Sequence, residues 1–177
     1  MITSNTAIHA AILSSGIGRS YKGSASSPED PKKNNKLFQS LKDLWKSAKQ
    51  TLWNVVSGNA LGADSAYAEG ANQVDESRVW LHLPWKSYNK ELIQPGNILR
   101  DYRAEWSEIA SRHHPIYDTL TFGAKKMMDR NAGIMIDSDV ALAVLNHSRV
   151  GWGGTWHGWN VAGELGKPRF DLTKMKS

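Results

Sequence analysis

The sequence predicts an α/β fold with an open, mostly parallel central sheet. Two observations support this prediction: short apolar segments alternate with segments of helical periodicity, and Gly-rich turns follow several of the apolar segments. The chain has 177 residues, of which 40% are hydrophobic and 22% are charged. This length suits a single domain over residues 1–177, and the apolar fraction excludes general disorder.

Each element follows from its local pattern. Short apolar segments predict strands at residues 8–15, 53–56, 78–83, 139–145 and 168–172. Apolar residues at helical spacing predict helices at residues 37–52, 63–74, 98–109, 117–131 and 155–165. Segments rich in Ser, Gly, Pro and Asn predict loops at residues 20–35 and 86–97. Alternation of strand and helix over the whole length favours a parallel sheet.

Several classes of protein are excluded. The chain has no Cys, which excludes disulfides, thiolate metal sites and cysteine nucleophiles. It has no apolar run of about 18 residues or more, so no membrane-spanning helix is expected. The apolar stretch from Ile8 to Leu13 is short and lacks the basic start of a signal peptide. We therefore expect a cytoplasmic protein without a membrane partner, and the spacing of His, Asp and Glu predicts neither a metal nor a cofactor.

The net charge of +5 is concentrated at one end of the chain. Residues 1–50 contain eight Lys or Arg and three Asp or Glu, whereas residues 51–177 contain 14 of each kind. One interpretation is a solvated basic loop and helix at about 20–50. The other is a patch, through the basic residues 19–49, that attracts nucleic acid or another polyanion. The sequence leaves both open.

The chain has eight Trp residues, and seven of them form two groups. The spacing of four of them within predicted helices and strands indicates core positions: Trp45, Trp53, Trp80 and Trp106. Three others cluster around one Gly-rich turn: Trp152, Trp156 and Trp159. Trp152 lies in that turn itself, where an indole ring can stack on a base or anchor an interface.

Three Gly-rich turns fall where predicted strands end, at residues 14–20, 57–65 and 151–155. Glycine lets backbone N–H groups approach a ligand, and the start of the following helix favours anions. Ligands of parallel α/β sheets bind beyond the carboxyl ends of the strands. These turns are therefore either structural corners or a phosphate or nucleotide site, in which Thr155 caps its helix or donates to a phosphate.

The order of these motifs resembles the SLOG superfamily, which includes DprA and LOG proteins. The resemblance covers roughly residues 12–172 and is carried by Gly16-Ile17-Gly18, Ser57-Gly58-x-Ala60-x-Gly62-Ala63-Asp64-Ser65, Leu83-Pro84-Trp85 with Tyr88-Asn89, Arg130-Asn131, Gly153-Gly154-Thr155 and Gly166-Lys167-Pro168. It is closest to small single-domain members common in bacteriophages. The resemblance implies a three-layer Rossmann-like domain that binds a nucleotide or nucleotide-derived ligand.

Members of this superfamily differ in function. LOG enzymes cleave the N-glycosidic bond of nucleoside monophosphates with a Glu three residues after the Gly-Thr pair, where this chain has Gly158. The resemblance thus argues against an enzyme. DprA-like members bind single-stranded DNA, and others recognise ADP-ribose-type signals in antiphage defence, so a phage protein that sequesters such a signal is a further hypothesis. Members often form homo-oligomers. Asn59 stands where a Gly is usual.

The candidate site residues have alternative roles. Asp64 either bonds a ribose hydroxyl or caps a helix. Arg130 either clamps a phosphate or pairs with Asp129 or Asp137. His157 is either a ligand contact or a polar residue of a helix surface. The full set of ligand-binding candidates is Ser15, Gly16, Gly18, Arg19, Ser57, Gly58, Gly62, Ala63, Asp64, Tyr88, Arg130, Asn131, Trp152, Gly153, Gly154, Thr155 and His157.

Overall fold

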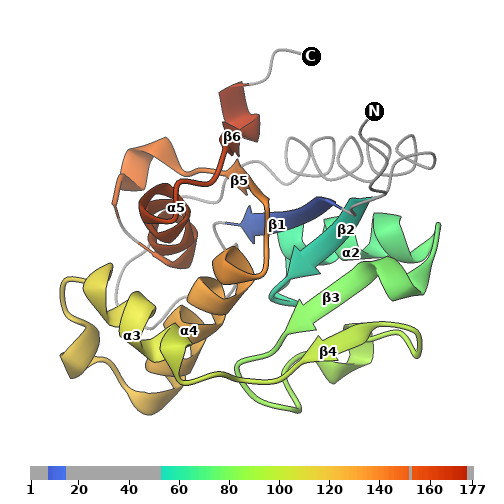
Figure 1. Cartoon of the computed structure of the whole chain (residues 1–177), viewed down its shortest axis with the longest axis horizontal. Coiled ribbons are helices and arrows are strands. Elements are labelled where there is room, and N and C mark those ends of the chain that lie inside the picture. The colour runs from blue at the N-terminus through green and yellow to red at the C-terminus, as the bar shows by residue number, and fades with distance from the viewer. Residues whose placement is uncertain (1–7, 15–52, 152, 175–177) are drawn as a thin grey trace, which may run out of the picture.

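A six-stranded parallel sheet forms the centre of the computed structural model, which describes residues 8–14, 53–151 and 153–174 (Figure 1). The strands are β1 (Ile8–Ser14), β2 (Trp53–Ser57), β3 (Val79–His82), β4 (Ile98–Arg100), β5 (Val140–Val144) and β6 (Arg169–Asp171). Their order in the sheet is β4-β3-β2-β1-β5-β6, and every neighbouring pair is parallel. The predicted α/β class and parallel sheet are confirmed.

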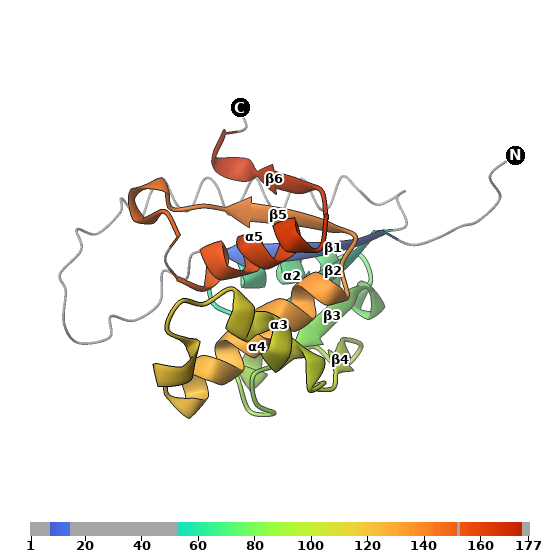
Figure 2. The same cartoon turned by 60° about the vertical axis from the view of Figure 1, so that its left-hand side comes forward.

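Helices cover both faces of this sheet. Helix α2 (Ala63–Asn72) packs on one face, and α3 (Glu105–Arg112), α4 (Phe122–Ile136) and α5 (Gly154–Glu164) pack together on the other (Figures 1 and 2). Short 3-10 turns lie at Glu76–Arg78, Lys90–Leu92, Tyr117–Thr119, His147–Arg149 and Leu172–Lys174. The arrangement is a three-layer, Rossmann-like fold.

Side chains of the strands β2, β3 and β5 alternate between two cores. Val55 belongs to the core under α2, whereas its neighbour Val56 belongs to the core under α3, α4 and α5. In β5, Ala141 and Ala143 face the second core. Small side chains at these positions, and at the fully buried Ala11 of β1, leave room for α5 to lie close to the sheet. The continuous apolar pattern of β5 therefore reflects burial on both faces.

Two predicted helices begin later than their apolar spacing indicates. Ile98 was expected to start a helix but lies in edge strand β4, where it pairs with Trp80, and α3 begins only at Glu105. The expectation was wrong because apolar residues of an exposed edge strand happened to match the spacing of the following helix. Similarly, residues 117–119 form a 3-10 turn, and α4 starts after its N-cap Thr121. The expected helix 37–52 and loop 20–35 lie outside the described residues.

The order of the strands reverses beside β1. Strands β2, β3 and β4 extend the sheet on one side of β1, whereas β5 and β6 lie on the other, with Ser14 of β1 level with Val144 of β5. Loops that leave such a pair of strands in opposite directions open a crevice at the carboxyl edge of the sheet. The turns after β2 and β5 reach this edge, and we build the candidate site there.

Two of the predicted core tryptophans have described side chains. Trp106 is 1% exposed at the centre of the core under α3, α4 and α5, which confirms its predicted burial. Trp80 is half-buried and packs on the same core, as do Trp156 and Trp159. Within the described ranges, no helix is long and apolar enough to cross a membrane.

Candidate functional site at the carboxyl edge of the sheet

Arg130 of α4 reaches the turn that follows β2. Its Nη1 donates a hydrogen bond to the carbonyl oxygen of Gly58 at 2.6 Å, and the whole residue is only 6% exposed. A Cβ atom on Gly58 would lie 2.0 Å from that nitrogen, which is far inside van der Waals contact. Gly58 is thus glycine because the guanidinium occupies the space of a side chain.

This buried arginine has no carboxylate partner among the residues that the structure describes. The sequence offered Asp129 and Asp137 as partners, and the structure contradicts both pairings. Asp129 accepts hydrogen bonds from hydroxyl groups, and Asp137 lies in a separate cluster with two other arginines. A buried guanidinium without a counter-charge is unfavourable, so this part of the fold suits an anion.

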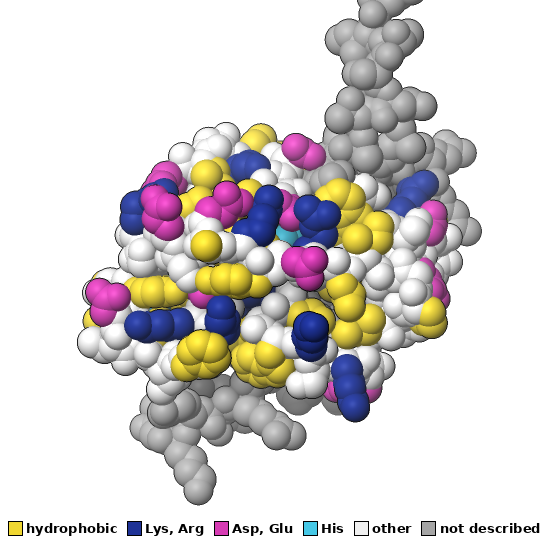
Figure 3. All heavy atoms as spheres, turned by 60° about the horizontal axis from the view of Figure 1, so that its bottom comes forward, with side chains coloured by type: hydrophobic (Ala, Val, Ile, Leu, Met, Phe, Trp, Pro, Cys, Tyr) yellow, Lys and Arg dark blue, Asp and Glu magenta, His cyan; other side chains and the backbone are white. Residues whose placement is uncertain are grey.

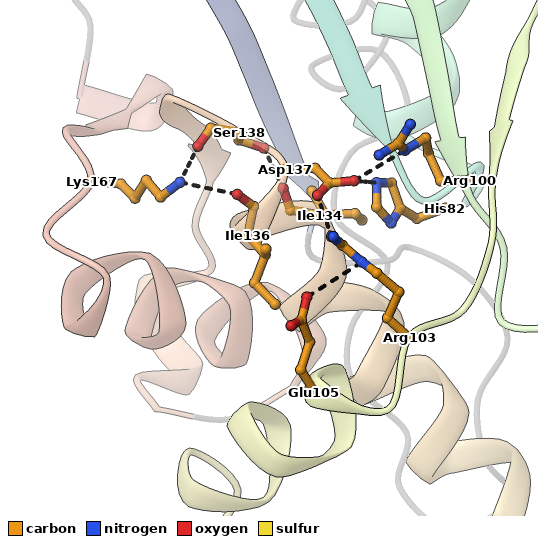
Figure 4. A network of polar contacts seen from close by, with 9 residues as sticks. All are labelled: His82, Arg100, Arg103, Glu105, Ile134, Ile136, Asp137, Ser138 and Lys167. Carbon is orange, nitrogen blue, oxygen red and sulfur yellow. Dashed lines mark hydrogen bonds and ion pairs between the residues drawn. The ribbon is translucent and has the colours of Figure 1, made fainter.

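Asp137 ends α4 and joins it to β3 and β4 (Figure 4). Its carboxylate accepts from Arg103 and from Nε of Arg100 at 3.1 Å, and Nε2 of the buried His82 lies 3.3 Å away. Burial opposes ionisation of Asp137, but the hydrogen bond to His82 and the charges of both arginines hold its pKa well below the usual range. Burial lowers the pKa of His82, which favours the neutral ring.

Asp129, one residue before Arg130, joins α4 to α3. The carboxylate is 2% exposed and accepts hydrogen bonds from the hydroxyls of Tyr117, Ser107 (2.9 Å) and Tyr102 (3.3 Å). Burial, together with the hydrogen bond to Asp129, raises the pKa of Tyr117 to about 12. Hydroxyl donors therefore satisfy this carboxylate on the side of α4 that faces α3.

The start of α5 lies beside Asn131. Gly153 is the N-cap, with a φ of 88° and no side-chain cap, and Asn131 Nδ2 donates to the carbonyl oxygen of Gly154 at 3.0 Å. Thr155 does not cap the helix; it is 3% exposed, and its Oγ1 has no hydrogen-bond partner within the described part of the chain. A buried hydroxyl without a partner beside uncapped helical N–H groups suits a ligand oxygen.

The start of α2 is built by a second glycine turn. Gly62 is the N-cap with a φ of 117°, and its N–H donates to Ser65 Oγ at 3.1 Å. Asp64 is therefore not the N-cap that one interpretation made it, but a residue of the first turn that is 4% exposed. Ser57 Oγ accepts from the N–H of Asn59 at 3.2 Å, and Ala63 is buried in the core under α2.

Tyr88 borders Arg130 from the loop after β3. The Tyr88 ring centroid lies 5.8 Å from Cζ of Arg130, and the edge-to-face contact with Trp85 has a centroid distance of 5.1 Å. The Asn59 side chain donates to the Tyr88 carbonyl oxygen, and the Asn89 side chain donates to that of Asn59. The sequence placed Tyr88-Asn89 near the ligand but did not predict these hydrogen bonds. The signal was present: Asn59 replaces a usual Gly, and Asn adopts positive φ more readily than most residues.

His157 faces the interior of the protein. It is 3% exposed, and its Nε2 lies 3.0 Å from the carbonyl oxygen of Ala110 in α3. Burial lowers the pKa of His157 to about 4, so the ring is neutral near pH 7 and donates to that carbonyl. The alternative of a polar surface residue was wrong, and these contacts connect α5 to α3.

The structure thus brings together Gly58, Tyr88 and Arg130, and it places Asn131 against Gly154. Five candidates lie outside the described residues: Ser15, Gly16, Gly18, Arg19 and Trp152. A separate groove of about 440 Å³ lies between α2 and residues 91–94, but three of its lining residues are Glu69, Glu76 and Glu91, which does not suit an anion. Among the described residues, no group of three His, Asp or Glu side chains could hold a metal ion.

Comparisons with known proteins show the fold. No protein-family model matches the chain, and no curated protein matches it either. The solved structure of the structural-genomics target TM1055 is similar with a TM-score of 0.55 and 14% identity, over 94% of this chain and 78% of that one. DNA processing protein A from Helicobacter pylori, solved for its single-stranded DNA binding mode, has a TM-score of 0.57 and 18% identity, over 94% of this chain and 66% of that one. At these identities the likeness concerns the fold alone, and it supports the Rossmann-like architecture.

Proposed function

We propose that this protein binds a nucleotide or nucleotide-derived ligand at the carboxyl edge of its sheet, with Arg130 as the partner of the ligand's phosphate. The observation that carries the proposal is that Arg130 is only 6% exposed and that, among the described residues, its guanidinium contacts a carbonyl oxygen and an aromatic ring. A phosphate supplies the counter-charge that the described carboxylates do not, and arginine binds phosphate through charge-assisted hydrogen bonds.

The start of α5 supports the same ligand. Its N-terminal N–H groups have no side-chain cap, and the adjacent Thr155 hydroxyl has no described partner. Asn131, the residue after Arg130, donates to the carbonyl oxygen of Gly154 in this turn. Helix N-termini with a nearby hydroxyl favour phosphate oxygens. Asp64 remains the candidate for a ribose hydroxyl, and Tyr88 the candidate for the base.

Calorimetric titration tests the proposal. AMP, ADP-ribose and cyclic ADP-ribose isomers are the probes, because ADP-ribose-type signals are the ligands of some SLOG proteins. Arg130→Met should abolish binding, whereas the matched control Arg112→Met, which removes an arginine paired with Glu108 and Glu164 on the surface, should retain it. Equal affinity in both variants would remove Arg130 from the site. Tight binding without turnover of an ADP-ribose-type probe would support sequestration of a defence signal.

A separate incubation with AMP tests whether the protein hydrolyses a nucleotide. The LOG-type glutamate position is Gly158, which is buried within α5 and has no carboxylate. Chromatography of AMP incubated with the protein should show no free base. Release of adenine in proportion to protein concentration would instead establish N-glycosidic cleavage and require another general acid.

Single-stranded DNA is a second candidate ligand, favoured by a surface at the start of α4. We call it the α4 aromatic face: Tyr102, Tyr117, Phe122, Lys125 and Lys126. Phe122 is 77% exposed, and Lys126 Nζ lies 3.5 Å from the Tyr102 ring centroid and 5.6 Å from that of Phe122. Figure 3, which views the molecule from this side, shows hydrophobic side chains interspersed with Lys and Arg. Exposed rings beside cations suit stacked bases and a phosphate backbone.

Fluorescence anisotropy with a labelled oligothymidylate distinguishes the two candidates. If the α4 aromatic face binds DNA, Phe122→Ala should weaken binding about tenfold, because one stacked base contributes roughly 1–3 kcal/mol. Lys174→Ala is the control, because it removes a 74% exposed cation that lies outside the α4 aromatic face. Affinity should also fall steeply with salt. Unchanged affinity in Phe122→Ala would exclude this surface.

A further inference from the structure

We infer that Asn59 and Asn89 are positioning residues for the ligand site: they clasp the loops after β2 and β3 and so place Tyr88 against Arg130. The inference rests on the proposed function, and it adds that the ligand carries an aromatic base which meets the wall formed by Tyr88 and Trp85. An inorganic anion needs Arg130 but not this wall. The clasp therefore selects nucleotides over bare phosphates.

The two side chains form reciprocal bonds to backbone. Asn59 Nδ2 donates to the carbonyl oxygens of Tyr88 at 3.3 Å and Asn89 at 3.0 Å, and Asn89 Nδ2 donates to the carbonyl oxygen of Asn59 at 2.8 Å. Asn59 is 1% exposed, so these bonds are partly buried. Three hydrogen bonds thus connect two loops that are about 30 residues apart in sequence.

Backbone strain marks the same two residues. Asn59 has a φ of 57° and Asn89 a φ of 44°, and they are the two non-glycine residues with positive φ in the described part of the chain. Glycine adopts this conformation without cost, and it is usual at the first position in the resembling family. Asparagine at both positions keeps the strained positive φ and adds side-chain hydrogen-bond donors that glycine lacks. Such strain is expected where the side-chain donors serve the functional site.

The clasp acts on the site through Tyr88. Its carbonyl oxygen accepts from Asn59, and its ring contacts both the indole of Trp85 and the guanidinium of Arg130. Trp85 is 45% exposed, so part of its aromatic surface is available to a base. Loss of the clasp frees the loop, and a ligand that contacts the wall must then order it on binding.

Asn59→Gly and Asn89→Gly test the inference, because glycine keeps the backbone conformation and removes only the clasp. Calorimetry compares AMP with inorganic pyrophosphate, and Asn97→Gly is the control, since Asn97 bonds instead to Asn72 and Glu76. Both clasp variants should bind AMP about tenfold more weakly while pyrophosphate affinity changes less than about twofold. Amide exchange of residues 86–92 should accelerate in both variants and not in the control.

The outcomes separate this inference from the proposed function. If the clasp variants bind AMP as tightly as the unmodified protein while Arg130→Met does not bind AMP, the clasp inference is wrong and the proposed function stands. Equal loss of AMP and pyrophosphate in the clasp variants also overturns it, since the clasp would then support the fold in general. If the unmodified protein binds neither AMP nor pyrophosphate, the clasp inference fails; if it also binds no ADP-ribose or cyclic ADP-ribose isomer, the proposed function fails with it.

Discussion

Replacing Gly58 with alanine forces Arg130 out of its place without straining the backbone. The new Cβ would lie 2.0 Å from Nη1 and 2.5 Å from Cζ, so the guanidinium must move by about 1.5 Å to reach an ordinary van der Waals separation. That movement breaks the 2.6 Å bond to the Gly58 carbonyl. Hydrogen bonds to charged groups contribute roughly 1.5–3 kcal/mol, so Gly58→Ala should lower the free energy of unfolding by about 2 kcal/mol.

A double-mutant cycle isolates this contact. In an Arg130→Ala background the clashing side chain is absent, so Gly58→Ala should cost less than about 0.5 kcal/mol. Urea unfolding followed by circular dichroism measures all four proteins. Gly123→Ala is the control: a Cβ there has no atom within 4 Å, and alanine in this first turn of α4 should raise stability by up to about 1 kcal/mol. Equal costs of Gly58→Ala in both backgrounds would refute the reasoning.

Three further predictions concern Arg130, the buried acceptor Asp129 and the buried His157. Arg130→Met removes a buried charge that has no described counter-charge, so it should change the free energy of unfolding by less than about 1 kcal/mol in urea titrations although it abolishes AMP binding. A loss of stability above about 3 kcal/mol would indicate that Arg130 forms a buried ion pair with a carboxylate. Asp129→Ala should cost about 3 kcal/mol in the same assay and Tyr117→Phe about 1, because the first leaves three hydroxyls without their acceptor. Stability should fall by about 2 kcal/mol between pH 7 and 5, and His157→Gln should remove most of that fall.

The sign of the pH effect follows from the direction of the pKa change. Burial lowers the pKa of His157 from 6.5 in its unperturbed state to about 4 in the folded protein. Between these two values the unfolded chain binds a proton that the folded protein does not, so stability is complete above about pH 6.5 and falls as the pH decreases toward 4. A pH profile with the same slope in His157→Gln would assign the effect to His82, whose pKa burial also lowers.

The strands were predictable because burial on both faces leaves an unbroken apolar pattern, as in residues 140–144. Edge strand β4 was missed because its residues are half-exposed and their spacing merged with that of α3. At the site, local motifs predicted Arg130 and the glycine turns that follow β2 and β5. The contact of Arg130 with Gly58 joins residues 72 positions apart, and local patterns carry no record of such a pairing. The Asn59 clasp depends in the same way on a loop that only the fold brings near.

Helix α4 is anchored on both sides of Arg130. Asp129 fastens it to α3, and Asp137 at its end fastens it to β3 and β4. The guanidinium of Arg130 therefore projects from a helix that has little freedom to shift. The cost of removing this guanidinium from water is already met during folding. For a ligand, the consequence is kinetic: the observed association rate should rise linearly with ligand concentration in stopped-flow traces, because no slow rearrangement of this helix precedes or follows the encounter.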